Sequence, residues 1–179
     1  MPRQKHNPAQ VSFMENHGRT APAVPAIREA VREWQADDYP GATPISRRLL
    51  NYWFKTDHKL SNGQLFRYHV AQREAVESLI YVYEIARTRS LQALYERFIP
   101  AELSADIRLQ EYDDFARYCV KMATGSGKTK VMSLAIAWQY LNAVGDANPN
   151  YATTFLILAP NVIVFERLRL DFAGGRIFK

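Results

Sequence analysis

The segment between residues 116 and 143 constrains the fold of this chain more than any other. The short apolar run ARYCVKM, at 116–122, predicts a β-strand. This run continues directly into the glycine-rich sequence ATGSGKT at 123–129. From residue 127 to 143 the apolar residues recur at helical spacing. A strand that passes through a glycine-rich loop into a helix predicts an α/β fold with a parallel sheet.

Composition and charge limit the class of protein. The chain has 179 residues, of which 47% are hydrophobic and 23% charged, as in ordinary globular domains. Its formal net charge of +5 is compatible with a polyanionic partner but does not require one. No apolar run is long enough to cross a membrane, and the N-terminus lacks the apolar stretch of a secretory signal. We therefore expect a cytoplasmic protein without a membrane partner.

The single cysteine, Cys119, excludes an intramolecular disulfide framework and a cysteine-rich zinc cluster. Because Cys119 lies inside the apolar run at 116–122, we expect a buried, inert thiol.

Three regions are predicted along the chain. Residues 1–23 have no apolar period, which predicts a disordered tail. Residues 24–115 show helical spacing in several segments, the first of which should stop at the turn residues DDYPG at 37–41. The next opens with Thr43 as N-cap and Pro44 in the first turn, and its aromatic end, Tyr52, Trp53 and Phe54, is expected to pack inward. LSNGQ at 60–64 predicts a turn after it.

Residues 116–179 contain the strand, loop and helix described above and a second apolar run suited to a buried strand at 151–160. A further helical pattern follows, which the glycines at 174 and 175 should break.

The glycine-rich loop has the residue types that phosphate binding requires. Gly125 and Gly127 allow backbone conformations in which consecutive N–H groups converge on phosphate oxygens, and the following helix adds its N-terminal dipole. Lys128 is expected to reach the β- and γ-phosphates, and the hydroxyl of Thr129 to bind Mg²⁺. ATP or GTP is the implied ligand. The residues expected to contact it are Ala123, Thr124, Gly125, Ser126, Gly127, Lys128 and Thr129.

Three segments resemble a known family. The sequence KMATGSGKT is similar to motif I of superfamily 2 helicases and translocases, and particularly to the Res subunit of type III restriction enzymes. AQREAVESL at 71–79 resembles the Q-type motif of these proteins, and FLILAPNVIVFERL at 155–168 resembles their second strand and motif Ia. The resemblance implies an incomplete RecA-like P-loop NTPase domain preceded by a helical region. It also implies ATP and Mg²⁺ as cofactors, DNA as a partner, and a methyltransferase subunit as a possible second partner.

The resemblance also suggests roles for residues outside the loop. Gln72 is the candidate adenine reader, although a solvated helix glutamine is an equal alternative. Asn161, Arg167 and Arg169 are the candidate DNA contacts, although a solvated helix face is an alternative for the two arginines. For an aromatic residue beside adenine the choice stays open among Trp53, Phe54 and Phe66, and core packing is the favoured role of all three.

Several motor elements do not occur in the sequence. No DExx motif follows the second apolar run, and no second lobe or nuclease motif is present. We therefore expect an ATP-binding N-terminal fragment of a helicase-like restriction subunit, with ATP hydrolysis and DNA cleavage belonging to a remainder. One alternative is a non-enzymatic binding module with a remnant P-loop. A small P-loop kinase or GTPase is a weaker alternative, because Met122 replaces the first glycine of the general pattern.

Overall fold

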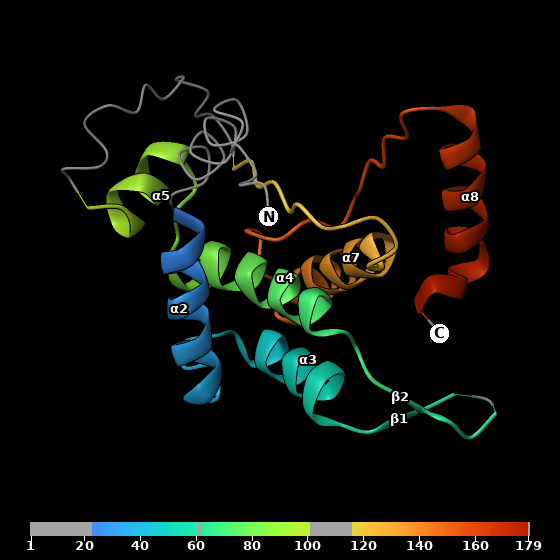
Figure 1. Cartoon of the computed structure of the whole chain (residues 1–179), viewed down its shortest axis with the longest axis horizontal. Helices are drawn as coiled ribbons and strands as arrows, with labels where there is room; N and C mark the ends of the chain where they lie inside the picture. The colour runs from blue at the N-terminus through green and yellow to red at the C-terminus, as the bar shows by residue number, and fades with distance from the viewer. Residues whose placement is uncertain (1–22, 61, 101–115, 179) are drawn as a thin grey trace, which may run out of the picture.

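The computed structural model of the chain describes residues 23–60, 62–100 and 116–178 (Figure 1). The disordered tail predicted for residues 1–23 lies outside this part of the chain, apart from Ala23, which is the first residue of a helix.

The first two helices agree with the local sequence signals. Helix α2 spans Ala23–Ala36 and α3 spans Pro44–Lys55. The predicted N-cap of α3 is confirmed, because Thr43 Oγ1 accepts a hydrogen bond from the backbone N–H of Ser46 at 3.0 Å. The chain between α2 and α3 turns through positive φ at Asp38 and Tyr39, within the predicted stop DDYPG.

A hairpin and three helical segments follow. Strands β1, His58–Lys59, and β2, Leu65–Phe66, pair antiparallel around the predicted turn at 60–64. Helix α4 spans Val70–Ile80 and continues into one π-helical segment, η1, at Tyr81–Ile85. Helix α5 spans Leu91–Phe98.

The helix after the glycine-rich loop, α7, spans Lys128–Gly145 and begins within one residue of the predicted position. Helix α8 spans Val162–Phe172, and a short 3₁₀ segment, η2, covers Ala173–Phe178. Gly174 and Gly175 both have positive φ, so the predicted break at these glycines is confirmed.

The predicted parallel sheet is not confirmed. Neither 116–122 nor 151–160 forms a strand, and the only sheet within the described residues is the two-stranded β1–β2 hairpin. A parallel strand needs neighbours in the sheet to pair its backbone groups, and in the described part of the chain neither segment has one. Both segments therefore lie beside the helices as irregular chain (Figure 1).

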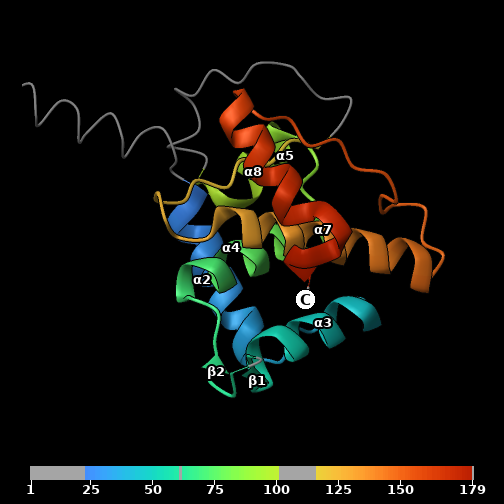
Figure 2. The same cartoon turned by 90° about the vertical axis from the view of Figure 1, so that its right-hand side faces the viewer.

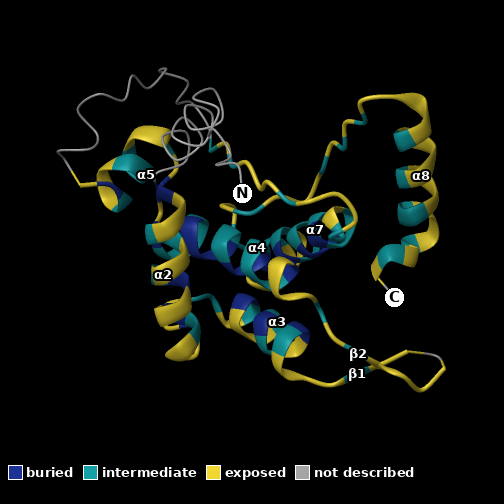
Figure 3. Ribbon diagram, viewed as in Figure 1, coloured by how far each residue is buried: buried dark blue, intermediate teal, exposed yellow. Residues whose placement is uncertain are grey.

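The core lies among α2, α3, α4, η1 and α7, which we call the helical body. Its most deeply buried side chains come from all of these elements, and include Trp34, Leu50, Val76, Ile80, Val82, Leu134 and Trp138. Figure 3 shows this buried surface on the faces that the helices turn toward one another. Because α7 shares the core with α2–α4, the regions predicted as 24–115 and 116–179 pack together around the start of α7.

A polar cluster in the helical body ties α7 to α3. Glu84, in the π-helical segment, accepts hydrogen bonds from Trp138 Nε1 and Tyr151 Oη, both at 2.8 Å, and from the hydroxyl of Ser46. Its second oxygen accepts from the backbone N–H of Thr43 at 3.1 Å. The π-helical segment widens the helix locally, and the carboxylate of Glu84 meets four donors from three other parts of the chain.

Two expectations about burial are wrong. Cys119 is exposed, because the run that contains it is not covered as a sheet strand would be. Tyr52 was expected to turn inward at the end of α3, but 56% of its surface is exposed, whereas the adjacent Trp53 is only 7% exposed. The two positions point about 100° apart on the helix, and the core lies on the side of Trp53.

Candidate functional site

The glycine-rich loop forms a tight turn directly before α7. Gly125 has φ 80° and Gly127 has φ 83°, which are left-handed conformations that a residue with a Cβ adopts only with strain. The loop is closed by Ser126, whose hydroxyl donates to the carbonyl of Ala123 at 2.7 Å and whose backbone N–H donates to the same oxygen at 3.3 Å. Helix α7 then starts at Lys128, the residue predicted to bind phosphates.

Backbone donors are available at this helix start. The carbonyl of Gly127 accepts from the N–H groups of Lys130 and Val131, which begin the hydrogen bonding of α7. No described residue accepts from the N–H groups of Gly127, Lys128 or Thr129. Free N–H groups at a helix N-terminus, combined with the helix dipole, form an anion-binding arrangement. The loop geometry therefore fits phosphate.

The side chain of Lys128 folds back over the loop. Its Nζ donates to the carbonyl of Ala123 at 2.9 Å and lies 3.5 Å from the carbonyl of Met122. These neutral acceptors hold the ammonium group beside the loop without a carboxylate partner within the described residues. A phosphate is a stronger acceptor than a carbonyl, so the ammonium can exchange these bonds for a charged partner.

Thr129, the predicted Mg²⁺ ligand, lies in the first turn of α7 and is partly exposed. No group of three or more His, Cys, Asp or Glu side chains that would hold a metal ion occurs within the described residues. A hydroxyl alone is a weak ligand, and Mg²⁺ keeps several waters and phosphate oxygens in its shell. Thr129 therefore fits Mg²⁺ that arrives with a nucleotide, rather than a metal ion held by the protein alone.

Gln72 contacts the loop directly. It is the third residue of α4, only 8% of its surface is exposed, and its Nε2 donates to the carbonyl of Ser126 at 3.1 Å. Its Oε1 accepts from the backbone N–H of His69 at 3.0 Å. The alternative of a solvated helix glutamine is thus wrong. Adenine recognition by Gln72 stays a prediction.

The three aromatic candidates occupy different surroundings. Trp53 is buried in the core, as favoured from the sequence. Phe54 and Phe66 are partly buried and pack edge-on against Tyr68, with ring centroids 5.4 and 4.9 Å away. Phe54 and Phe66 therefore belong to a small aromatic cluster at the base of the hairpin.

The predicted DNA contacts lie on or beside α8. Asn161 is the N-cap of this helix, and its Oδ1 accepts from the N–H of Val164 at 3.0 Å. Arg169 is paired with Glu166, with its NH2 and the carboxylate 2.8 Å apart, whereas Arg167 is exposed and pairs with no described residue. Both predicted arginines thus lie on an exposed helix, and Arg167 is the one whose charge is uncompensated.

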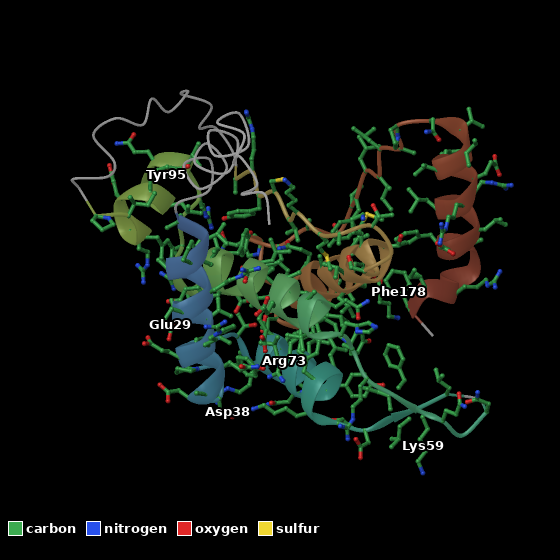
Figure 4. The ribbon with its side chains drawn as sticks, viewed as in Figure 1. Glu29, Asp38, Lys59, Arg73, Tyr95 and Phe178 are labelled. Carbon is green, nitrogen blue, oxygen red and sulfur yellow. The ribbon has the colours of Figure 1, made fainter. Side chains whose placement is uncertain are left out.

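Two polar contacts near the loop were missed in the sequence. Lys130, in the first turn of α7, donates from Nζ to the carbonyl of Ile177 at 2.7 Å, and burial lowers the pKa of its ammonium group below the usual range. This bond ties the end of the chain, near Phe178 in Figure 4, to the start of α7. Because every residue has a backbone carbonyl, no residue type in the sequence could have indicated the contact between Lys130 and Ile177.

The second missed contact is a buried carboxylate under α4. Glu77 is 2% exposed and accepts from Arg73 Nε at 2.8 Å and from Tyr39 Oη at 2.6 Å. Burial, and then the Glu77 carboxylate, raise the pKa of the Tyr39 hydroxyl above its usual range. The spacing of Arg73 and Glu77, four residues apart on a helix, was the available signal. Tyr39, which hydrogen-bonds to both side chains, holds the N-terminal half of α4, and with it Gln72, against the α2–α3 turn.

None of the described helices combines the length and apolar character needed to span a membrane.

Residues 66–176 match the family described as type III restriction enzyme, res subunit. The matched range includes α4 with Gln72, the glycine-rich loop, α7 and α8. The searches of curated proteins and of solved structures returned no match.

Proposed function

The chain belongs to the type III restriction enzyme res subunit family, which consists of helicase-like, RecA-like P-loop domains, and on this premise we propose that it binds ATP·Mg²⁺ through residues 123–129. The observation that carries the proposal is the loop itself. Two left-handed glycines precede a helix whose first N–H groups are free of described acceptors, and Lys128 stands at its first position.

Each group has a separate task in this proposal. The free N–H groups of Gly127, Lys128 and Thr129 hold the phosphate oxygens, and the ammonium of Lys128 moves from the carbonyl of Ala123 to the β- and γ-phosphates. The hydroxyl of Thr129 contributes one ligand to the Mg²⁺ of the nucleotide. The metal ion, when bound, reduces the negative charge on the phosphates.

Hydrolysis needs groups that this sequence does not supply. Phosphoryl transfer in such motors uses an acidic residue beside the metal ion and a residue that positions the attacking water. The sequence contains no Asp-Glu pair at any position. We therefore assign ATP hydrolysis, translocation and DNA cleavage to a longer assembly, in which this chain provides nucleotide binding.

DNA contact is the second part of the proposal. Arg167 is exposed and uncompensated, so it can meet a phosphate group without first breaking an ion pair. Arg169 must first leave Glu166, and Asn161 can donate from its amide nitrogen while its oxygen caps α8. Arg167→Gln should therefore lower DNA affinity at low salt more than Arg169→Gln, as measured by fluorescence anisotropy with a labelled duplex.

A modification methyltransferase subunit is the proposed protein partner, on family grounds alone.

Titration with a fluorescent ATP analogue in the presence of Mg²⁺ tests the main proposal. Lys128→Ala should weaken binding roughly tenfold or more, because a charge-assisted hydrogen bond contributes about 1.5–3 kcal/mol. Lys121→Ala is the matched control, since Lys121 is an exposed lysine just before the loop, and it should change the affinity less than about twofold.

Equal affinity of wild type and Lys128→Ala for the analogue would contradict the assignment of the loop. In that case the chain would be better described as a binding module with a remnant P-loop.

A further inference from the structure

Gln72 connects two elements that are 54 residues apart in sequence. Its side-chain oxygen caps the N-terminus of α4 through the N–H of His69, and its side-chain nitrogen donates to the carbonyl of Ser126 in the loop. Helix α4 is itself held to the α2–α3 turn by Tyr39, whose hydroxyl donates to the buried carboxylate of Glu77 and accepts from Arg73. The loop is therefore attached to a rigid helix through one amide group.

The position of Gly127 depends on the same amide. A Cβ built on Gly127 would lie 2.0 Å from Gln72 Nε2 and 3.2 Å from Gln72 Cδ. No side chain fits in this space unless the amide moves. Gly127 is thus required both for its left-handed φ of 83° and for the close approach of Gln72.

The side-chain amide of Gln72 also sets the direction of the backbone N–H of Gly127, one of the groups proposed to bind phosphate. In a planar trans peptide the C=O and the N–H point in opposite directions. Because the carbonyl of Ser126 points to Gln72, the N–H of Gly127 points away from α4. Rotation of this peptide unit would turn the N–H of Gly127 out of the set of donors at the start of α7.

Both hydrogen-bonding ends of the amide are in use. Turning the edge of this amide toward a base would break its bonds to the N–H of His69 and to the carbonyl of Ser126. We propose that Gln72 is a positioning residue that holds the Ser126–Gly127 peptide in its phosphate-binding orientation, so that it raises affinity for the polyphosphate whatever base is attached. This inference deepens the proposed nucleotide binding and rests on it.

Binding of three ligands separates phosphate positioning from adenine recognition. The ligands are ATP, GTP and inorganic tripolyphosphate, each with Mg²⁺, titrated into the full chain by calorimetry. Gln72→Ala should weaken all three by a similar factor, roughly fivefold. Gln72→Glu keeps the acceptor for His69 and loses the donor to Ser126, so it should also weaken all three ligands, and by a larger factor because its carboxylate repels the phosphates. Gln92→Ala, on the first turn of α5, is the matched control and should leave all three affinities unchanged.

A loss confined to ATP, with GTP and tripolyphosphate unaffected, would overturn the proposal and support adenine recognition instead. Circular dichroism of each variant at the titration temperature separates these results from unfolding. If Gln72→Ala unfolds α4, Gln72→Glu still tests the proposal, because it keeps the hydrogen bond that caps this helix.

A second measurement needs no nucleotide. Hydrogen exchange of the free protein should be faster at the N–H groups of Lys130 and Val131, which donate to the carbonyl of Gly127, in both Gln72 variants and unchanged in α3. Unchanged exchange at these two amides would overturn the positioning role. If wild type bound neither ATP nor tripolyphosphate, the proposed function would fail, while the exchange result would still decide whether Gln72 holds the loop.

Discussion

The helical body and the C-terminal arm, which we define as residues 152–178, contain similar apolar side chains but bury them very differently. In the body Leu50 and Ile80 have no exposed surface, whereas in the arm Leu156 is 85% and Leu158 81% exposed. Helix α8 has no buried residue at all. Figures 1 and 2 show α8 beside the body rather than within it.

The difference follows from what surrounds each segment. The helices of the body bury their apolar faces against one another, which requires no other part of the chain. The apolar run at 155–158 is suited to a strand, and a strand buries its side chains only when a sheet and its covering layers are present. The arm meets the body through η2, which contacts α7, and through the bond from Lys130 to Ile177.

The glycine-rich loop lies where these two regions join. Gln72 contacts the loop from the body, and the loop leads into α7, whose buried apolar side chains are Val131, Leu134 and Trp138. The loop is thus held mainly by the well-packed region, and the arm adds the bond from Lys130 to Ile177.

The largest expected effect is a contrast between two leucines. Leu50→Ala should lower the free energy of unfolding by about 2–5 kcal/mol, because it leaves a cavity in the core of the body. Leu158→Ala removes the same atoms from an exposed site and should change the free energy of unfolding by less than about 0.5 kcal/mol. Urea denaturation followed by tryptophan fluorescence measures both. Equal effects would mean that the arm is packed in solution.

A smaller effect is expected for two glutamates. Glu84→Gln replaces a carboxylate that accepts from Trp138, Tyr151, Ser46 and Thr43 with an amide whose NH₂ group faces donors. We expect a loss of about 1–3 kcal/mol in the same denaturation experiment.

Glu166→Gln in the arm is the control for this substitution. It removes only the exposed partner of Arg169 and should cost less than about 0.5 kcal/mol. If the two substitutions had the same effect, the polar cluster would contribute nothing to the stability of the body.

The smallest effect concerns Tyr151, the last residue before the arm. Burial, and then the carboxylate of Glu84, raise the pKa of its hydroxyl above the usual range. Below about pH 10 both the folded and the unfolded chain keep the tyrosine neutral. Above that pH the unfolded chain loses the proton while the folded chain retains it, so the free energy of unfolding falls as pH rises.

Tyr151→Phe should therefore make the alkaline decline in stability shallower. Because Tyr151 is only half-buried and solvent screens it, we expect a difference of about a few tenths of a kcal/mol per pH unit. Thermal denaturation between pH 9 and 11 measures it, with Tyr140→Phe as an exposed control on α7. If the free energy of unfolding fell equally steeply with pH in wild type and Tyr151→Phe, the hydroxyl of Tyr151 would not be bound to Glu84 in solution.

Much of the local structure was predictable from short-range signals. The cap at Thr43, the turn around Gly63, the start of α7 at Lys128 and the break at Gly174 each depend on residues within one turn of the chain. The strands at 116–122 and 151–160 were not confirmed, because an apolar run specifies a preference for burial, whereas a strand needs a neighbour to pair with.

The candidate site divides in the same way. The geometry of the glycine-rich loop follows from Gly125, Gly127 and Lys128 themselves, since a left-handed glycine and a helix start are local properties of the backbone. Only the tertiary structure decides what the amide of Gln72 contacts, and it places this amide against the carbonyl of Ser126. The same holds for the donors around Glu84 and for the exposure of Cys119. These features depend on groups far away in sequence, and the packing that brings them together is set by the whole chain.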